Sequence, residues 1–138
     1  EVAYTPEQLR DILVASGWDA AIMLDGGGIE IGDNVLLGPR VGIYTSNHAI
    51  DPGERAAGGC RAKGVRIAHN VWVGGGVQIN QGVSIGQNSI IGSGSVVTGD
   101  IPAGVIAAGV PCRVIREITE RDRTGYGREP APGEGGSD

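Results

Sequence analysis

The stretch at residues 71–97, VWVGGGVQINQGVSIGQNSIIGSGSVV, repeats its pattern every six residues and decides the fold. One apolar residue returns at the same place in each repeat, and this spacing extends back to residue 31. The residues at this anchor position are Ile31, Leu37, Ile43, Ile67, Val73, Ile79, Ile85, Ile91 and Val97. An α-helix repeats about every 3.6 residues and a strand about every two, so neither gives this period. Short strands joined by corners do, and three of them close one triangular coil. The pattern therefore predicts an all-β fold, a parallel β-helix of hexapeptide repeats with coils about 4.8 Å apart.

Small residues mark the corners of the predicted coils. A second set of small or β-branched residues stands two positions before most anchors, and Gly or Asn follows many anchors directly, as at Gly32, Gly38 and Gly74. Because Gly and Asn tolerate positive φ, we expect them to form the tight turns between strands.

The N-terminal segment at 1–28 carries helix-start signals. Thr5 can cap a helix, Pro6 suits its first position and Gln8 completes a capping box. These signals predict a short helix at 5–15, followed by a lead-in to the solenoid.

The rest of the chain divides into three parts. Residues 29–104 form the β-helix, interrupted at 49–64 by a Gly-rich, charged stretch without anchors, which predicts an extruded loop. Residues 105–128 form a charged C-terminal extension. The tail at 129–138 is rich in Pro, Gly and charge and is expected to be disordered.

The composition limits the classes of function. With a net charge of −5 and a pI near 4.9, the chain lacks the basic surface that nucleic acids or anionic membranes require. No apolar run is long enough to span a membrane, and the first residues do not resemble a signal peptide. Cys60 and Cys112 form neither a CxxC pair nor a disulfide framework, so we expect free thiols in a reducing compartment, the cytoplasm.

Four motifs carry a family resemblance. IGDNVLLGP, TSNHAID, NVWVGGG and AAGVPCRVIREI resemble the maltose and galactoside O-acetyltransferases of the hexapeptide acyltransferase family, and the similarity runs over about residues 23–122. The resemblance implies a left-handed β-helix, acetyl-CoA as acetyl donor, no metal, and a hydroxyl of a sugar or similar small molecule as acceptor. It also implies a homotrimer with a site at each interface, which outward-facing apolar residues such as Ile90 and Val96 would favour.

The resemblance makes His48 the general base. Transfer of an acetyl group to an alcohol requires removal of the hydroxyl proton, and imidazole is the side chain best suited to this near neutral pH. His48 stands where the repeat breaks into the loop, which places it at a subunit edge. The alternative is a surface histidine without a role. His69 occupies a corner position, and we expect it to be structural.

The remaining site residues are also implied by the resemblance. The backbone N–H of Gly75 matches the donor that stabilises the oxyanion of the tetrahedral intermediate, and Trp72 matches a residue beside the pantetheine arm. The alternative for Trp72 is a buttress between solenoids, and the two roles are compatible. Coenzyme A would further contact Ser93, Thr98, Gly99, Arg113 and Arg116, of which the two arginines lie near its phosphorylated head; the alternative for these arginines is a solvated charged face.

The acceptor segment departs from the family pattern. Family members carry a longer N-terminal region, whereas here the predicted helix leads almost directly into the solenoid. Trp18 falls where the family has an acceptor-contacting Asn, and Gly26 falls where the galactoside branch has an acidic residue, with Asp25 adjacent. The substrate-binding candidates are therefore Trp18, Asp25 and Gly26, and the acceptor stays open.

Two other functions occur on, or could use, the same kind of solenoid. A zinc carbonic anhydrase would need three histidines around its metal, and the chain has two, which excludes this function unless other ligands substitute. A catalytically silent trimeric scaffold that still binds coenzyme A is the second alternative. The altered acceptor segment favours it, and the joint presence of His48, Trp72, Arg113 and Arg116 opposes it.

Overall fold

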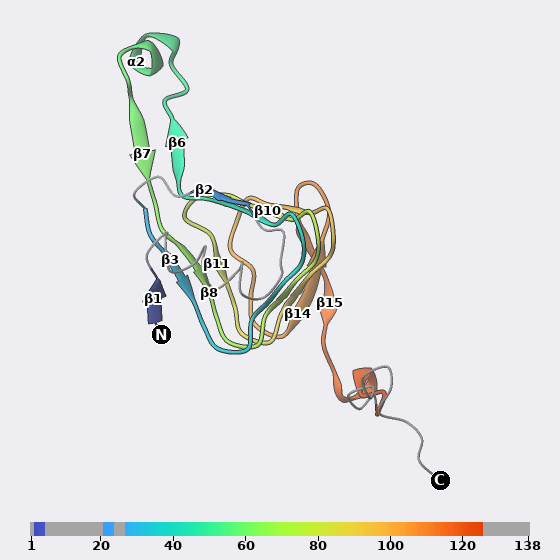
Figure 1. Ribbon diagram of the computed structural model, residues 1–138. Helices are drawn as coiled ribbons and strands as arrows, with labels where there is room; N and C mark the ends of the chain where they lie inside the picture. The colour runs from blue at the N-terminus through green and yellow to red at the C-terminus, as the bar shows by residue number, and fades with distance from the viewer. Residues whose placement is uncertain (1, 5–20, 24–26, 126–138) are drawn as a thin grey trace.

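The computed structural model describes residues 2–4, 21–23 and 27–125 and shows a triangular solenoid with one sheet on each side (Figure 1). Sheet A contains β1 (Val2–Tyr4), β3 (Ile29–Ile31), β8 (Val65–Ile67) and β11 (Ser84–Ile85). Sheet B contains β2 (Ala21–Met23), β5 (Gly42–Tyr44), β10 (Gln78–Ile79) and β13 (Val96–Val97). Sheet C contains β4 (Leu36–Leu37), β9 (Trp72–Val73), β12 (Ile90–Ile91), β14 (Val105–Ala108) and β15 (Arg113–Glu117).

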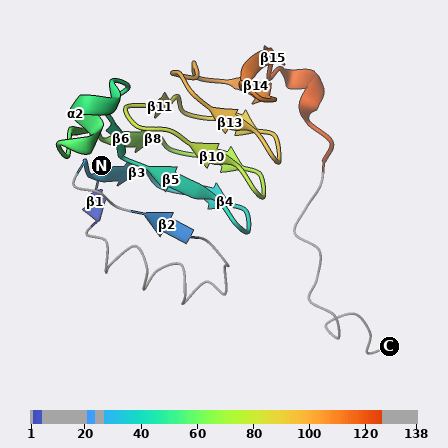
Figure 2. The same ribbon diagram turned by 90° about the horizontal axis from the view of Figure 1, so that it is seen from above.

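Successive coils stack in parallel register, and the chain visits the sheets in the order A, C, B (Figure 2). The winding is left-handed, as the family resemblance implies (Figures 1 and 2). Within these three sheets, two strands are antiparallel to their neighbours: β1 to β3, and β15 to β14. The predicted parallel β-helix is therefore confirmed, with antiparallel strands at both ends of the stack.

The anchor rows fill the interior. Ile43, Val73, Ile79, Ile91 and Val97 are completely buried, and the other predicted anchors are nearly so, except Ile31, which packs partly buried against the core. The small or β-branched residues two positions before the anchors are buried too, apart from the half-buried Val35. Inward-facing serines keep their hydrogen bonds: Ser89 Oγ donates to the Pro102 carbonyl at 2.7 Å, and Ser95 Oγ to the Gly92 carbonyl at 2.6 Å.

The backbone angles at the corners correct the expectation that the Gly or Asn directly after each anchor adopts positive φ. Positive φ occurs three residues after the anchor, at Asn34, Arg40, Asn70, Gly76, Gly82, Asn88 and Gly94, and not at the glycine that directly follows it. That glycine is needed for a different reason, which is close approach between coils. A Cβ on Gly32 would lie 2.7 Å from the backbone nitrogen of His69, and one on Gly74 would lie 2.6 Å from the backbone nitrogen of Ser93.

The predicted loop is an ordered hairpin, shown at the upper left of Figure 1. β6 (Ser46–His48) pairs antiparallel with β7 (Cys60–Ala62), and α2 (Pro52–Ala56) sits at the tip. The Asp51 carboxylate caps α2 by accepting the Glu54 N–H at 2.9 Å. The excursion thus begins at about residue 46, earlier than the predicted 49, because β6 continues the backbone pairing outward from the coil.

The two ends of the chain were less predictable. The sequence pattern did not predict β1 or β2, although β2 adds a rung to sheet B below β5. The helix expected at 5–15 and the tail expected at 129–138 lie outside the described residues. After β15 the chain forms the short 3-10 helix η1 (Glu120–Asp122). In the part of the chain that the structure describes, no helix has both the length and the apolarity that crossing a bilayer requires.

Candidate active site

His48 ends strand β6 and is exposed on the hairpin, outside the solenoid core. The hairpin leaves the corner between sheets B and A, because Thr45 follows β5 and Lys63 precedes β8. The Lys63 N–H donates to the Thr45 carbonyl at 2.7 Å and closes the hairpin base. An ordered platform therefore holds the imidazole away from the narrow interior, as the sequence predicted.

Cys60 lies directly opposite His48 across the hairpin. The Ala49 N–H donates to the Gly59 carbonyl at 3.0 Å, and residues 45 and 63 are joined by the bond at the hairpin base. Hydrogen-bonded and non-hydrogen-bonded pairs alternate along antiparallel strands, so His48 and Cys60 form a non-hydrogen-bonded pair, in which side chains on one face approach closely. The sequence analysis missed this neighbour, since the two residues are twelve positions apart.

His69, in contrast, belongs to the solenoid. Its Nδ1 accepts the backbone N–H of Asp33 at 2.7 Å and so joins the corners of two neighbouring coils. This contact agrees with the structural role expected for His69.

Trp72 projects from the outer face of sheet C with 52% of its surface exposed. It stands in register between Leu36 below and Ile90 above, and Ile106 continues the same row. Leu36 is 55% exposed, so the row forms an apolar stripe along sheet C. The outer face of sheet A differs, because Glu30 and Arg66 form an ion pair there at 2.8 Å.

Gly75 and Ser93 meet at the corner between sheets C and B. They follow β9 and β12 in successive coils, and the Gly94 N–H donates to the Gly75 carbonyl at 2.9 Å. Within the described residues the Gly75 N–H has no hydrogen-bond acceptor, while its neighbours Gly74 and Gly76 donate to Ile91 and Pro39. A backbone donor is therefore available beside Trp72, where the resemblance implies the oxyanion.

Thr98 and Gly99 lie elsewhere. They follow β13 and are exposed at the corner between sheets B and A, two coils above the hairpin base. The structure thus separates these two residues from Trp72, Gly75 and Ser93 in one chain, and places them on the edge that carries His48.

Arg113 and Arg116 extend from β15 at the end of sheet C. Arg113 is exposed, and its guanidinium contacts the neighbouring Cys112 carbonyl at 3.0 Å. Arg116 is held by the Asp122 carboxylate through two bonds of 2.8 and 2.9 Å. Cys112 is buried, and this burial raises the pKa of its thiol, which fits a packing role.

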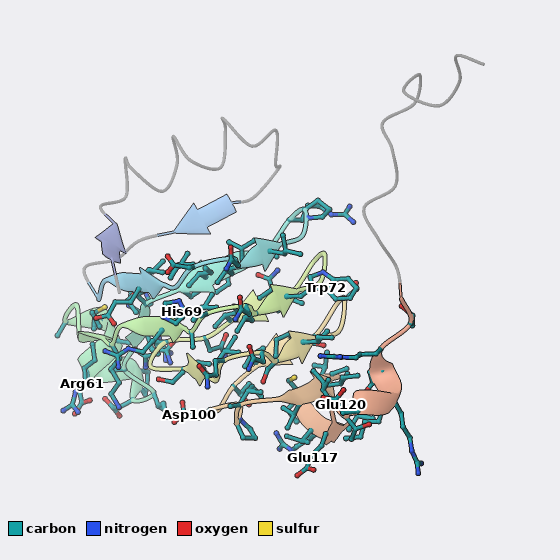
Figure 3. All side chains as sticks on the ribbon, turned by 90° about the horizontal axis from the view of Figure 1, so that it is seen from below. Arg61, His69, Trp72, Asp100, Glu117 and Glu120 are labelled. Carbon is teal, nitrogen blue, oxygen red and sulfur yellow. The ribbon has the colours of Figure 1, made fainter. Side chains whose placement is uncertain are left out.

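The site residues therefore fall into two groups on one chain. His48, Thr98 and Gly99 belong to the corner between sheets B and A, whereas Trp72, Gly75, Ser93 and both arginines belong to sheet C and its far corner. In a triangular cross-section that first corner lies opposite sheet C. Figure 3 shows the separation, with Arg61 of the hairpin and Trp72 at opposite ends of the molecule.

The three substrate-binding candidates lie outside the described part of the chain: Trp18, Asp25 and Gly26. An open hollow of about 310 Å³ on sheet A is lined by residues including Gly28, Glu30 and Arg66. The described residues contain no cluster of three or more His, Cys, Asp or Glu side chains that could hold a metal ion.

Comparisons with known proteins agree with the coil geometry in pointing to a hexapeptide-repeat protein. The family described as bacterial transferase hexapeptide (six repeats) matches residues 64–99. The galactoside O-acetyltransferase of Escherichia coli K12 is 48% identical over 98 residues, which cover 71% of this chain and 48% of that protein. The chain spans about half the length of the first curated relatives it matches.

Two solved structures share the fold. A galactoside acetyltransferase in complex with coenzyme A superimposes with a TM-score of 0.72 at 50% identity, over 75% of this chain and 51% of that one. The maltose O-acetyltransferase of Clostridium difficile 630 gives a TM-score of 0.70 at 39% identity, over 87% of this chain and 80% of that one. With its six-residue coils, extruded hairpin and this degree of identity, the chain belongs to the hexapeptide-repeat family, alongside the galactoside and maltose O-acetyltransferases.

Proposed function

We propose that this chain is an acetyl-CoA-dependent O-acetyltransferase that acetylates a hydroxyl of a sugar or a similar small molecule. Its relatives carry the names of galactoside and maltose O-acetyltransferases, and one related structure is a complex with coenzyme A. The observation that carries the proposal is the position of His48. The fold uses His69 to join its coils, whereas His48 stands exposed on an ordered hairpin that the β-helix itself does not need.

His48 acts as the general base in this proposal. Its imidazole takes the proton of the acceptor hydroxyl while the hydroxyl oxygen attacks the thioester carbonyl. The Gly75 N–H donates to the carbonyl oxygen, which gains negative charge as the bond forms. The carbon–sulfur bond of the thioester then breaks, and the proton held by His48 passes to the departing thiolate.

The residues of the second group fit a long donor with an apolar arm and a phosphorylated head. The stripe of Leu36, Trp72 and Ile90 offers an apolar wall, and Gly75 offers an unused N–H beside it. Arg113 and Arg116 lie farther along the same sheet, where guanidinium donors would meet phosphate oxygens. When bound, acetyl-CoA supplies the activated acetyl group, and these residues bind and orient it.

The two groups require assembly, because His48 and Gly75 lie on opposite parts of one chain. A homotrimer would bring the hairpin of one subunit against sheet C of the next and so complete three equivalent sites. The exposed apolar stripe of sheet C supports such packing, since large apolar surfaces usually mark interfaces. Thr98 and Gly99 would then contact the donor from the subunit that supplies His48.

The test is thiol release from acetyl-CoA with maltose, glucose, galactosides and other hydroxylated acceptors. We expect His48→Ala to lower kcat about a hundred- to ten-thousand-fold, the usual contribution of a general base, with little change in coenzyme affinity. His69→Gln is the matched control, since it removes the other histidine without touching the proposed site.

Two results would contradict the proposal. Substantial activity of His48→Ala would remove His48 from the role of base. A trimeric wild type that binds coenzyme A and releases no thiol with any acceptor would instead favour the catalytically silent scaffold.

A further inference from the structure

The guanidinium of Arg116 is held in place before any ligand binds. Its Nη1 and Nη2 donate to the two oxygens of the Asp122 carboxylate at 2.9 and 2.8 Å, and Nη1 also donates to the Glu117 carbonyl at 3.0 Å. A bidentate pair of this kind fixes the plane of the guanidinium as well as its position.

Asp122 is fixed in turn by the backbone. One of its oxygens accepts the Thr119 N–H at 2.8 Å, within the turn of η1. The hydrogen bond from Arg116 and then the Thr119 N–H lower the pKa of the Asp122 carboxyl to about 2, so it is ionised at any pH near neutrality. The carboxylate is therefore a permanent, oriented partner for Arg116.

Two donors of Arg116 are left over. A guanidinium carries five N–H donors in a fixed fork, and Asp122 and Glu117 take three of them. The remaining Nε–H and the second N–H of Nη2 lie on the same side of the group and point in the same direction. Within the described residues neither of them has an acceptor. They form a second bidentate face that matches two oxygens of a phosphate.

We propose that Asp122 is a positioning residue that holds Arg116 so that its free Nε and Nη2 donors face a phosphate group of the coenzyme. The inference rests on the proposed function, because that function supplies the phosphorylated donor. Asp122 occupies the end of the guanidinium and leaves its side free, so it orients the cation without filling the anion-binding face. A pre-ordered side chain binds more tightly because its rotamer freedom is not lost again on binding.

The sign of one mutational effect tests this inference. Asp122→Asn removes a negative charge near a bound phosphate, so simple electrostatics predicts tighter binding of coenzyme A. Positioning predicts the opposite, a loss of about three- to tenfold, the size expected when a long side chain must be ordered by its ligand. Glu120→Gln is the matched control: it removes the same charge from the same turn, but Glu120 is exposed and pairs with Arg123.

The experiment measures Kd for coenzyme A by calorimetry and KM for acetyl-CoA in the wild type, Asp122→Asn, Asp122→Glu, Arg116→Ala and Glu120→Gln. We expect Asp122→Asn and Arg116→Ala to raise KM for acetyl-CoA with little change in kcat, and Asp122→Glu to recover part of the loss. A short acetyl thioester without phosphate, used as the donor, should show the same KM in all variants.

Three outcomes overturn the positioning role. Tighter binding of coenzyme A by Asp122→Asn would mean that the carboxylate competes with the phosphate for Arg116. Unchanged binding would mean that Asp122 has no influence on the coenzyme. A parallel loss with the phosphate-free donor would indicate general damage to the fold. Each of these outcomes comes from a protein that still transfers acetyl groups, whereas a wild type that binds no coenzyme would overturn the proposed function itself.

Discussion

The side chains of His48 and Cys60 face each other across a non-hydrogen-bonded position of the hairpin. This placement gives the proposed base a thiol neighbour on the same surface of the strand pair. Cys112, the second thiol, is 4% exposed and packs in the core, and burial raises its pKa. The two cysteines therefore differ in their access to solvent, although the sequence suggested the same description for both.

Alkylation of the native protein should distinguish the two thiols. We expect a bulky maleimide to label Cys60 quickly and to abolish acetyl transfer, because the adduct would cover the imidazole of His48. Cys112 should react only after unfolding, and mass spectrometry of digested protein reads both sites. A Cys60→Ala variant should be protected from inhibition by the reagent; full activity of labelled wild type would show that His48 and Cys60 are farther apart than their pairing indicates.

At the scale of the element, each strand is too short to be stable alone, and its stability comes from the coils above and below. The glycines that follow the anchors let neighbouring coils approach closely, as at Gly74 against Ser93. The asparagines at positive φ add a second link: Asn34 donates to Asn70 at 3.3 Å, and Asn70 donates to Asn88 at 3.1 Å. The six-residue period therefore encodes coil spacing as well as an apolar interior.

Substitution of Gly74 by Ala should destabilise the solenoid. The new Cβ would meet backbone and side-chain atoms of Ser93 at 2.6 to 2.9 Å, and overpacking of this kind costs about 1–3 kcal/mol. Gly99→Ala is the control, since its Cβ would meet no atom of the described residues within 4 Å. Chemical denaturation at one fixed protein concentration compares the free energy of unfolding of the two variants. Equal values would mean that neighbouring coils can move apart slightly without loss of stability.

For the whole molecule, the decisive feature is that the candidate site residues fall into two groups. His48 leaves the corner between sheets B and A, while Trp72 and Gly75 lie on sheet C and at its far corner. No rearrangement within one rigid triangular coil can join these groups. The proposed reaction therefore depends on a neighbouring copy of the chain, and oligomeric state becomes part of the mechanism.

Mixed oligomers should recover activity from two inactive variants. His48→Ala lacks the base, and Gly75→Pro lacks the N–H donor, whose loss alone costs about a hundred- to a thousand-fold in rate. In an equimolar mixture about one quarter of the interfaces pair an intact His48 with an intact Gly75, if partners are exchanged at random in a cyclic oligomer. The rate should rise to about that share of wild type; mixed oligomers that stay inactive would place both residues in one subunit's site.

The sequence by itself determined the β-helix, its interior rows and the approximate point where the chain leaves the solenoid. These features repeat every six residues or interrupt that repeat, so a local pattern encodes them. The same pattern misassigned the glycines, because positive φ and close approach both favour a small residue, and only stacked coils distinguish the two causes. Residues 46–62 gave no strand signal, since pairing between β6 and β7 replaces the solenoid register.

Only the tertiary structure decided which residues meet. It put Cys60 opposite His48, bound Asp122 to Arg116, and separated Thr98 and Gly99 from Trp72. These relations depend on which of the three sheets a residue occupies and on which residues pair across the hairpin. The spacing of the anchor residues reveals neither. The sequence could therefore name candidates for the site, and the folded chain showed that the described candidates fall into two separate groups.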